Sequence, residues 1–432
     1  ITMEWKDYYK LHTCTAHEAA NAIKDNYRLV YGNATGYPQV FCKALAEQKD
    51  RFTNVSIYNM LITGTPWHID EKMKGHFQTI TSFISRPSLK GMQEGLIEFI
   101  PCYLRQVPLL FSEGYYPVDV AVEQVSPPND EGYCSFGVAN DYTKPAADNA
   151  RIVIGEINDQ TPCTWGDNFI HVTDLDYIIE TSYPLVETPS PVATEVELSI
   201  AKHCASLIND GDTLQLGIGG LPNAVLASLK DRKDLGIHTE LFTEGVIDLV
   251  NEGVITGKRK TLHPNKLIAT FIMGTKRVFD FVHNNPMLEL HPVDYVNNPN
   301  VIGQNDNMVS INSCIEVDLM GQVNSESIGL NQYSGPGGQV DYVQGVRLSK
   351  GGKSIIAIPS TAAGGKLSRI VPFLSHGAAV TTSRNDVDYV VTEYGIAHLR
   401  GRTLRERAKM LIGLAHPNFR EKLMEEFVRR YK

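Results

Sequence analysis

The sequence predicts an α/β protein with two related domains, each built on a mainly parallel sheet. Strand-like apolar runs alternate with helix-like stretches along the chain, which is typical of parallel sheets covered by helices. One order of elements (helix, strand, small-residue turn, helix) occurs twice, roughly half a chain apart. The 432 residues also exceed what one hydrophobic core normally holds, so two domains are expected.

The first occurrence of this order starts at Thr15-Ala16-His17-Glu18, a capping box that begins a helix. A strand over 27–31 and a turn over 32–38 follow. Pro38 is expected to be the first residue of the next helix, where its missing N–H and fixed φ suit the first turn.

The second occurrence starts at another capping box, Thr194-Glu195-Val196-Glu197. A strand over 213–216, the glycine turn and a helix opened by Pro222 follow in the same order. Glycine turns at 131–137 and 320–325 form a second matching pair, which favours a duplication.

The run 181–191 contains three prolines and is expected to be an extended linker. The predicted domains are therefore residues 1–185 and 192–432. The charged stretch 405–432 is expected to form an amphipathic helix pair, split near Pro417. Apolar runs in the second half predict further buried strands at 266–271, 354–358 and 389–392.

The composition is that of a globular protein, 42% hydrophobic and 21% charged, with a net charge of -9. The acidic balance argues against nucleic-acid and membrane partners, which bind basic surfaces. No apolar run approaches the roughly 20 residues that span a bilayer, and Ile1 to Lys6 show no signal-peptide pattern, so a cytoplasmic location is expected. The cysteines and histidines are scattered without metal-ligand spacing, so we expect reduced thiols and no metal.

A glycine turn, Gly217-Ile218-Gly219-Gly220, lies between a strand and a helix, where backbone N–H groups can face an anion. It is neither the Rossmann fingerprint, because Pro222 stands in place of the third glycine, nor a Walker A loop. A tight turn without a ligand explains the same residues. The run Ser334 to Asp341 carries the same two interpretations.

Several carboxylates are expected near strand ends. Glu240 lies near the carboxyl end of the strand-like run 236–241, where open α/β sheets bind ligands, although a solvated glutamate fits equally well. Glu244 competes with it but precedes a helix, and Glu393 follows another expected strand.

Glu316 and Asp318 are expected to share one face of a strand. Lys366, Arg369 and Arg384 lie in glycine-rich or turn segments, where they could meet phosphates or remain surface cations.

Segments along nearly the whole chain resemble the acetyl-CoA hydrolase/transferase family, and within it the 4-hydroxybutyrate and butyryl-CoA:acetate CoA-transferases. The resemblance implies two related α/β domains in the CoA-transferase (NagB/RpiA-like) fold, an active site between the domains, and a homodimer. Its residues are Leu216 to Pro222, Gly236 to Glu240, Glu316 to Ser325, Ser334 to Asp341, His376 to Arg384 and, in the first half, Ser126 to Gly132.

The resemblance also implies the site. Glu240 matches the family's nucleophile, and Gly338 matches the glycine that borders the CoA thioester and donates a backbone amide. Ile315 and Lys366 fall in segments that contact CoA, whereas Glu244 receives no role. No prosthetic group is implied; coenzyme A and acyl-CoA are substrates, together with short carboxylic acids. The family's CoA loop corresponds to Gly217, Ile218, Gly219, Gly220 and Leu221.

The expected function is a CoA-transferase that moves CoA between a short-chain acyl-CoA, of the 4-hydroxybutyryl or butyryl type, and a carboxylate such as acetate. The expected route is ping-pong covalent catalysis through a glutamyl-CoA thioester. The alternatives are an acyl-CoA hydrolase of the same family and a non-catalytic acyl-CoA-binding protein. A dinucleotide-dependent oxidoreductase is a weaker one, because the fingerprint is missing.

The acyl chain is not encoded in a readable motif. Tyr37, Pro38 and the loop Thr63 to His68 are candidate walls of a pocket for the acid, and Trp67 in that loop offers bulk. Ordinary packing explains the same residues.

Overall fold

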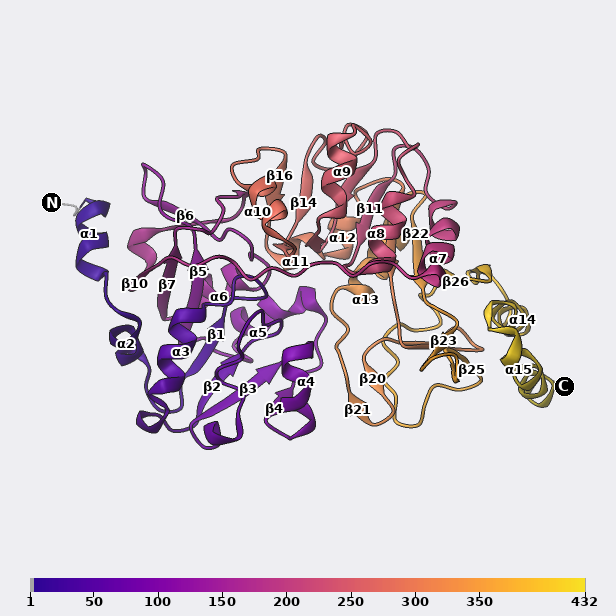
Figure 1. Cartoon of the computed structure of the whole chain (residues 1–432), viewed down its shortest axis with the longest axis horizontal. Helices are drawn as coiled ribbons and strands as arrows, with labels where there is room; N and C mark the ends of the chain where they lie inside the picture. Colours follow the sequence, from indigo (N-terminus) through magenta and orange to yellow (C-terminus); the bar gives the residue numbers. More distant parts are fainter. Residues whose placement is uncertain (1–3, 432) are drawn as a thin grey trace. The chain divides into compact units, whose positions relative to one another are not determined.

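The computed structural model describes residues 4–431, so part of the stretch Ile1 to Lys6, for which no signal-peptide pattern was predicted, lies outside the described residues. The chain divides into two compact units: unit 1 comprises Ile1–Pro189 and Ile268–Val296, and unit 2 comprises Ser190–Leu267 and Asn297–Lys432. Both are mixed α/β structures with mainly parallel sheets, which confirms the predicted fold class (Figure 1). The domain bounds 1–185 and 192–432 stay a prediction.

A parallel sheet forms the centre of unit 1. Its strands are β1 (Arg28–Tyr31), β2 (Val55–Tyr58), β3 (Phe77–Thr81), β4 (Ile97–Phe99), β5 (Val120–Val125), β7 (Ile152–Asn158) and β10 (Tyr177–Thr181). They lie in the order β10-β7-β5-β1-β2-β3-β4, and all neighbours are parallel. Because the sheet grows from β1 in both directions, the chain reverses beside β1, which is where such sheets bind ligands.

Helices cover both faces of this sheet. Phe41 packs with Val122 on one face, and Phe111 packs with Ala121 on the other, as expected for neighbouring residues of one strand. The helical segments are α1 (Trp5–His12), α2 (Ala16–Ala19), η1 (Ala20–Ala22), α3 (Gln39–Glu47), η2 (Lys49–Arg51), η3 (Glu71–Met73), α4 (Arg86–Gln93), η4 (Leu104–Gln106), α5 (Val107–Ser112), α6 (Thr143–Asn149), η5 (Val172–Asp174), α10 (Lys276–Val282) and α11 (Val293–Val296). Shorter strands are β6 (Tyr133–Ser135), β8 (Trp165–Gly166), β9 (Phe169–His171), β15 (Phe271–Ile272) and β16 (Leu288–Leu290). The strand β14 (Leu267–Ala269) has its first residue in unit 2 and its other two in unit 1.

Unit 2 repeats the strand order of unit 1. Its main strands are β11 (Thr213–Leu216), β12 (Gly236–His238), β17 (Met308–Asn312), β22 (Lys353–Ala357), β26 (Tyr389–Thr392) and β27 (Gly395–His398). The parallel neighbours β26-β22-β17-β11-β12 match β10-β7-β5-β1-β2, and β27 adds an antiparallel edge. This match supports the predicted duplication.

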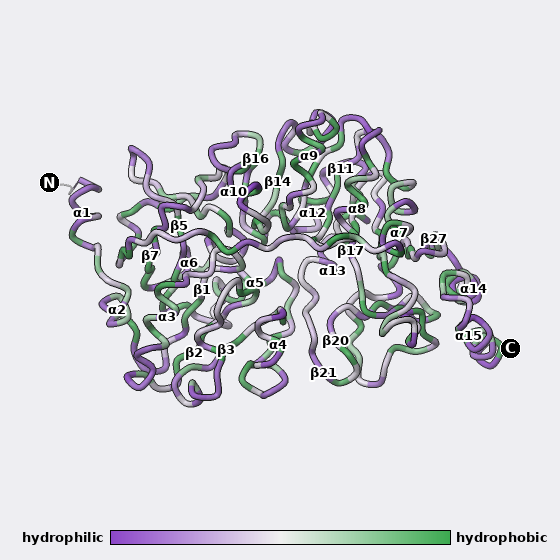
Figure 2. The backbone as a smooth tube through the Cα atoms, in the orientation of Figure 1, coloured by the Kyte–Doolittle hydropathy of each residue, from purple (hydrophilic) through white to green (hydrophobic). Residues whose placement is uncertain are grey.

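Helices also cover the sheet of unit 2. Tyr342 packs with Met308 of β17, and Leu411 and Leu423 pack with Val390 of β26. The helices are α7 (Glu195–Ala205), α8 (Gly220–Ala227), α9 (Gly245–Asn251), α12 (Pro299–Ile302), α13 (Gln339–Leu348), α14 (Leu404–Leu414) and α15 (Pro417–Arg430). Short strands are β13 (Leu241–Phe242), β18 (Glu316–Asp318), β19 (Val323–Asn324), β20 (Ser327–Ile328), β21 (Asn331–Gln332), β23 (Thr361–Ala362), β24 (Leu367–Ser368) and β25 (Ile370–Val371). The helix pair predicted at the C-terminus is confirmed, and α15 is mostly hydrophilic in Figure 2.

Local predictions are confirmed at both capping boxes, since Thr15 and Thr194 each accept the N–H of the glutamate three residues later. Two helix starts were wrong: α8 begins at Gly220, not at Pro222, and α3 begins at Gln39, not at Pro38. Gly219 adopts φ 119° and acts as the N-cap, and Pro222 is tolerated within the first turn because its N–H is not needed there. Pro38 is likewise the N-cap of α3.

Within residues 4–431, none of the helices combines the length and the hydrophobicity that crossing a membrane requires. The cysteines are all free; Cys42, Cys134, Cys204 and Cys314 are buried, and the remaining ones are half-buried.

Candidate active site

The glycine turn and Glu240 follow neighbouring strands of unit 2. The strands β11 and β12 are parallel, so their carboxyl ends lie at the same edge of the sheet. The hydroxyl of Thr239 donates to the carbonyl of Leu216 at 3.1 Å, which ties the two strand ends together. Glu240 is the next residue, so it lies at the edge that carries the turn.

The Glu240 carboxylate is half-buried and held by an asparagine. Nδ2 of Asn297 donates to Oε2 of Glu240 at 2.7 Å and to Oδ2 of Asp341 at 3.3 Å. The side chains of Asn297 and Asp341 are fully buried, whereas Glu240 retains some exposure. The site therefore has an immobilised amide next to an accessible carboxylate.

Gly338 gives this carboxylate its space. A Cβ at position 338 would overlap Oε2 of Glu240 and would lie 2.6 Å from Nδ2 of Asn297. Gly338 has φ -96°, which any residue can adopt, so glycine is needed here for room rather than for backbone conformation.

Gln339 anchors the start of α13 behind the site. Its amide donates to the carbonyl of Ser313 at 2.6 Å and accepts from the hydroxyls of Ser325 (2.8 Å) and Thr382 (2.9 Å). Both ends of the Gln339 side chain are thus bonded, and this fixes Gly338 and Asp341 in place.

Tyr342 provides a buried aromatic wall next to the site. Its ring centre lies 6.4 Å from that of His238. Burial raises the pKa of the Tyr342 phenol well above its usual value, and the charges of Glu240 and Asp341 raise it further. The phenol therefore stays neutral.

The glycine turn itself is open. A Cβ at Gly217 would meet no atom within 4 Å, and Ile218 is 46% exposed. Gly219 has φ 119°, which strongly favours glycine. A Cβ at Gly220 would lie 2.6 Å from Oε2 of Glu197. The turn thus has free space on its outer side, where a ligand could approach backbone N–H groups.

Other carboxylates near strand ends have structural roles. Glu393 accepts the N–H of Ser360 at 2.7 Å. Glu316 accepts both the N–H (2.8 Å) and the hydroxyl (2.9 Å) of Ser375. Asp318 accepts backbone N–H groups of the turn that follows it. Each of these groups holds a loop in place.

The remaining predicted residues are spread over unit 2. Ile315 is half-buried after β17, and Lys366 is exposed on the turn between β23 and β24. Arg369 and Arg384 donate to acceptors of the protein, and Glu244 is the N-cap residue of α9. The roles of Ile315 and Lys366 in binding CoA stay a prediction.

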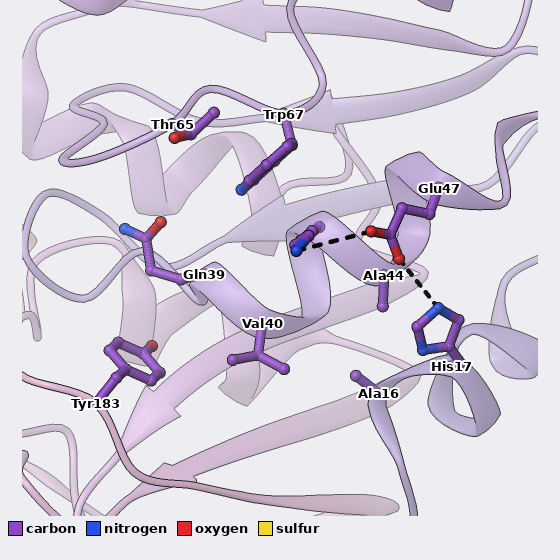
Figure 3. Close-up of a pocket in the computed structure, with 10 residues that line it drawn as sticks. Ala16, His17, Gln39, Val40, Ala44, Glu47, Thr65, Trp67 and Tyr183 are labelled. Atoms are coloured by element: carbon purple, nitrogen blue, oxygen red, sulfur yellow. Dashed lines mark hydrogen bonds and ion pairs between the residues drawn. The ribbon is translucent and has the colours of Figure 1, made fainter.

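The residues predicted as candidate walls of a pocket for the acid lie in unit 1. Tyr37 is fully buried in the hydrophobic core, and Pro38 caps α3. Thr65 and Trp67, by contrast, line a cavity of about 430 Å³ beside α3, with Gln39 among its walls (Figure 3).

Asn297 is the residue that the sequence did not indicate. It precedes Asn298 and Pro299, and this run has the pattern of a helix start. Asn298 indeed caps α12 by accepting the N–H of Asn300. The polar Asn297 directly after Val296 is the only local signal that this residue gives.

Proteins of known structure and curated relatives match this chain over nearly its full length. The structure of 4-hydroxybutyrate CoA-transferase from Porphyromonas gingivalis is 47% identical with a TM-score of 0.87, and the match covers 99% of this chain and 100% of that one. The 4-hydroxybutyrate coenzyme A transferase of Clostridium kluyveri is 56% identical over 429 residues, 99% of this chain and 100% of the relative. The succinyl-CoA:cyclohexane-1-carboxylate CoA transferase of Geobacter metallireducens is 46% identical over 417 residues, 96% of this chain and 95% of the relative. By class, the chain is a CoA-transferase.

Two family models place it more closely. The acetyl-CoA hydrolase/transferase N-terminal domain matches residues 2–187, and the C-terminal domain of the same family matches residues 274–427. The chain belongs to the acetyl-CoA hydrolase/transferase family, which confirms the resemblance found in the sequence.

Proposed function

We propose that the chain moves CoA between a short-chain acyl-CoA, of the 4-hydroxybutyryl or butyryl type, and a carboxylate such as acetate, through a thioester on Glu240. The observation that carries this proposal is the half-buried Glu240 carboxylate, held by Asn297 at 2.7 Å and given room by Gly338. The names of the Clostridium and Porphyromonas proteins suggest 4-hydroxybutyrate as the acid to test first.

The first half-reaction loads CoA onto the enzyme. A carboxylate oxygen of Glu240 attacks the acyl-CoA carbonyl, the C–S bond breaks, and CoA leaves as a thiolate from a mixed acyl-glutamyl anhydride. The thiolate then attacks Cδ of Glu240 and breaks the anhydride C–O bond. The original acid leaves as a carboxylate, and a glutamyl-CoA thioester remains.

The second half-reaction reverses these steps with another acid. The incoming carboxylate attacks Cδ and expels the thiolate, which then attacks the new acyl carbon and restores the Glu240 carboxylate. One negative charge moves between oxygen and sulfur throughout, and the thioester energy is kept. CoA is a substrate here, and the exchange itself requires no redox change.

The protein's contribution is positioning and charge stabilisation. Asn297 can donate to the oxygen of Glu240 as its carbon passes through tetrahedral states, and one such donor supplies roughly 3 kcal/mol. The glycine turn offers backbone N–H groups to CoA at the same edge of the sheet. The buried ring of Tyr342 keeps water away on one side, which protects the anhydride and the thioester from hydrolysis.

A trapping experiment tests the proposal. Incubated with butyryl-CoA and no acid, the enzyme should carry CoA on Glu240, detected by peptide mass after borohydride reduction or hydroxylamine treatment. Glu240→Gln should give no adduct, and Glu244→Gln should give the adduct of the wild type. An adduct on Glu244 or Glu393 would overturn the assignment.

Acetate dependence separates a transferase from a hydrolase. A transferase should consume butyryl-CoA rapidly only when acetate is present and should release acetyl-CoA. Consumption at the same rate without acetate would identify water as the acceptor, and an unreactive Glu240 would favour a non-catalytic binding protein. A panel of short acids, beginning with 4-hydroxybutyrate, then defines the acid.

A further inference from the structure

The amide of Asn297 is oriented from one end. Its Nδ2 faces two carboxylates, Glu240 at 2.7 Å and Asp341 at 3.3 Å. Its Oδ1 is buried and has no hydrogen-bond partner among the described residues. A flipped amide would direct Oδ1 at two carboxylate oxygens and would bury the N–H groups without an acceptor. The two carboxylates therefore determine which end of Asn297 faces Glu240.

These two carboxylates differ in how firmly they are held. Glu240 lies in a bend after β12 and is half-buried. Asp341 is fully buried in the first turn of α13, directly after a segment anchored by Gln339 and two residues before the buried Val343. Only Glu240 changes chemically in the proposed reaction, where it becomes an anhydride and then a thioester. Asp341 stays the same acceptor in every intermediate.

We propose that Asp341 is a positioning residue that keeps the Nδ2 end of Asn297 on Glu240 throughout the reaction. This inference rests on the proposed function and assigns to Asp341 a role that it exerts through Asn297. An acylated Glu240 oxygen is a weaker acceptor than a carboxylate, so it holds the amide less firmly. The bond to Asp341 then becomes the main one that prevents the amide from turning.

A simpler explanation is that Asp341 stabilises α13, since an acidic residue in the first turn interacts favourably with the helix dipole. That role would lower the unfolding temperature when Asp341 is changed and would leave the chemistry of the folded enzyme unaltered. The two explanations therefore differ in a rate measured on folded protein.

The test measures single-turnover formation of the Glu240 adduct with saturating butyryl-CoA. Asp341→Asn should slow adduct formation about tenfold, while KM for butyryl-CoA stays within about twofold. In the Asn297→Ala background, the same change should have little further effect, because Asp341 acts through Asn297. Glu316→Gln is the matched control, a buried carboxylate of the same unit that bonds Ser375, and it should form the adduct at the wild-type rate.

A wild-type rate in Asp341→Asn, or a tenfold loss that persists in the Asn297→Ala background, would overturn the inference. If Asp341→Asn does not fold, Asp341→Ala is measured in the same way; failure of both to fold would assign Asp341 to the fold alone. Failure of the proposed function has a different signature, because the wild type itself would then form no adduct on Glu240.

Discussion

The corresponding turns of the two units are built in opposite ways. In unit 1 the turn 32–38 after β1 is entirely buried, and a Cβ at Gly36 would lie 2.7 Å from that of Ala139. The carboxyl group of Glu156, from β7, accepts the N–H of Phe41 in the first turn of α3 at 2.8 Å. In unit 2 the turn after β11 is open, and Gly217 has free space beside it.

The difference shows how a repeated fold can hold one ligand site. Unit 1 supplies its own carboxyl group to the N-terminal end of α3, and Tyr183 donates to that group at 2.5 Å. Unit 2 leaves the turn before α8 open and carries Glu240 just after the next strand, β12. A helix end that is already bonded internally is not available to an external anion.

The largest effect is expected from a substitution that fills the space next to Glu240 in unit 2. Gly338→Ala should lower kcat/KM at least about a hundredfold, because the new methyl group takes the space of the carboxylate. Gly413→Ala is the matched control: a Cβ there meets no atom within 4 Å, and alanine in α14 should stabilise the helix by up to about 1 kcal/mol. Steady-state kinetics and thermal unfolding separate the two. Wild-type kcat/KM in Gly338→Ala would mean that Glu240 does not react in this position.

An intermediate effect is expected from removing the titratable carboxyl group of Glu156 in unit 1. Burial raises the pKa of Glu156 from 4.5 to about 7, although bonds from Tyr183 and Phe41 oppose the rise. The folded chain then binds the proton more tightly than the unfolded chain, so this group makes the wild type less stable as pH rises from about 4.5 to about 7. Glu156→Gln cannot titrate, so its unfolding free energy should gain about 3 kcal/mol relative to the wild type between pH 4.5 and pH 8.

Urea unfolding at several pH values measures that difference. The exposed Glu113→Gln is the control and should follow the wild type at every pH, since its carboxylate is in water in both states. Parallel curves for wild type and Glu156→Gln would show that Glu156 is not the buried acid inferred here.

The smallest expected effect compares the two turns directly. Gly217→Leu should raise KM for butyryl-CoA about tenfold without lowering the unfolding temperature, because the side chain enters free space that CoA is proposed to use. Gly36→Ala should do the reverse: it should destabilise unit 1 by about 1–3 kcal/mol through its clash with Ala139 and leave KM unchanged. An unchanged KM in Gly217→Leu would show that CoA does not bind at this turn.

Features encoded by neighbouring residues could be predicted from the sequence. The capping boxes at Thr15 and Thr194 and the strand Thr213–Leu216 depend on residues a few positions apart. The family resemblance then pointed to Glu240 and Gly338, which the structure places in contact.

The roles proposed for Asn297 and Asp341 could not be predicted, because they depend on contacts over long distances in sequence. Asn297 meets Glu240 across 57 residues and Asp341 across 44. The role of Glu156 could not be predicted for the same reason, since it accepts the N–H of Phe41 across 115 residues. No periodicity or turn pattern connects positions so far apart.

The segment 268–296 has a consequence for how the chain is made. It belongs to unit 1, although 78 residues assigned to unit 2 (190–267) precede it. During synthesis, β11, α8 and Glu240 therefore leave the ribosome before unit 1 has all of its parts, so unit 1 cannot complete its fold until part of unit 2 has been made. A gene fragment that stops at Pro189 should accordingly yield an incomplete unit 1, because residues 268–296 are missing from it.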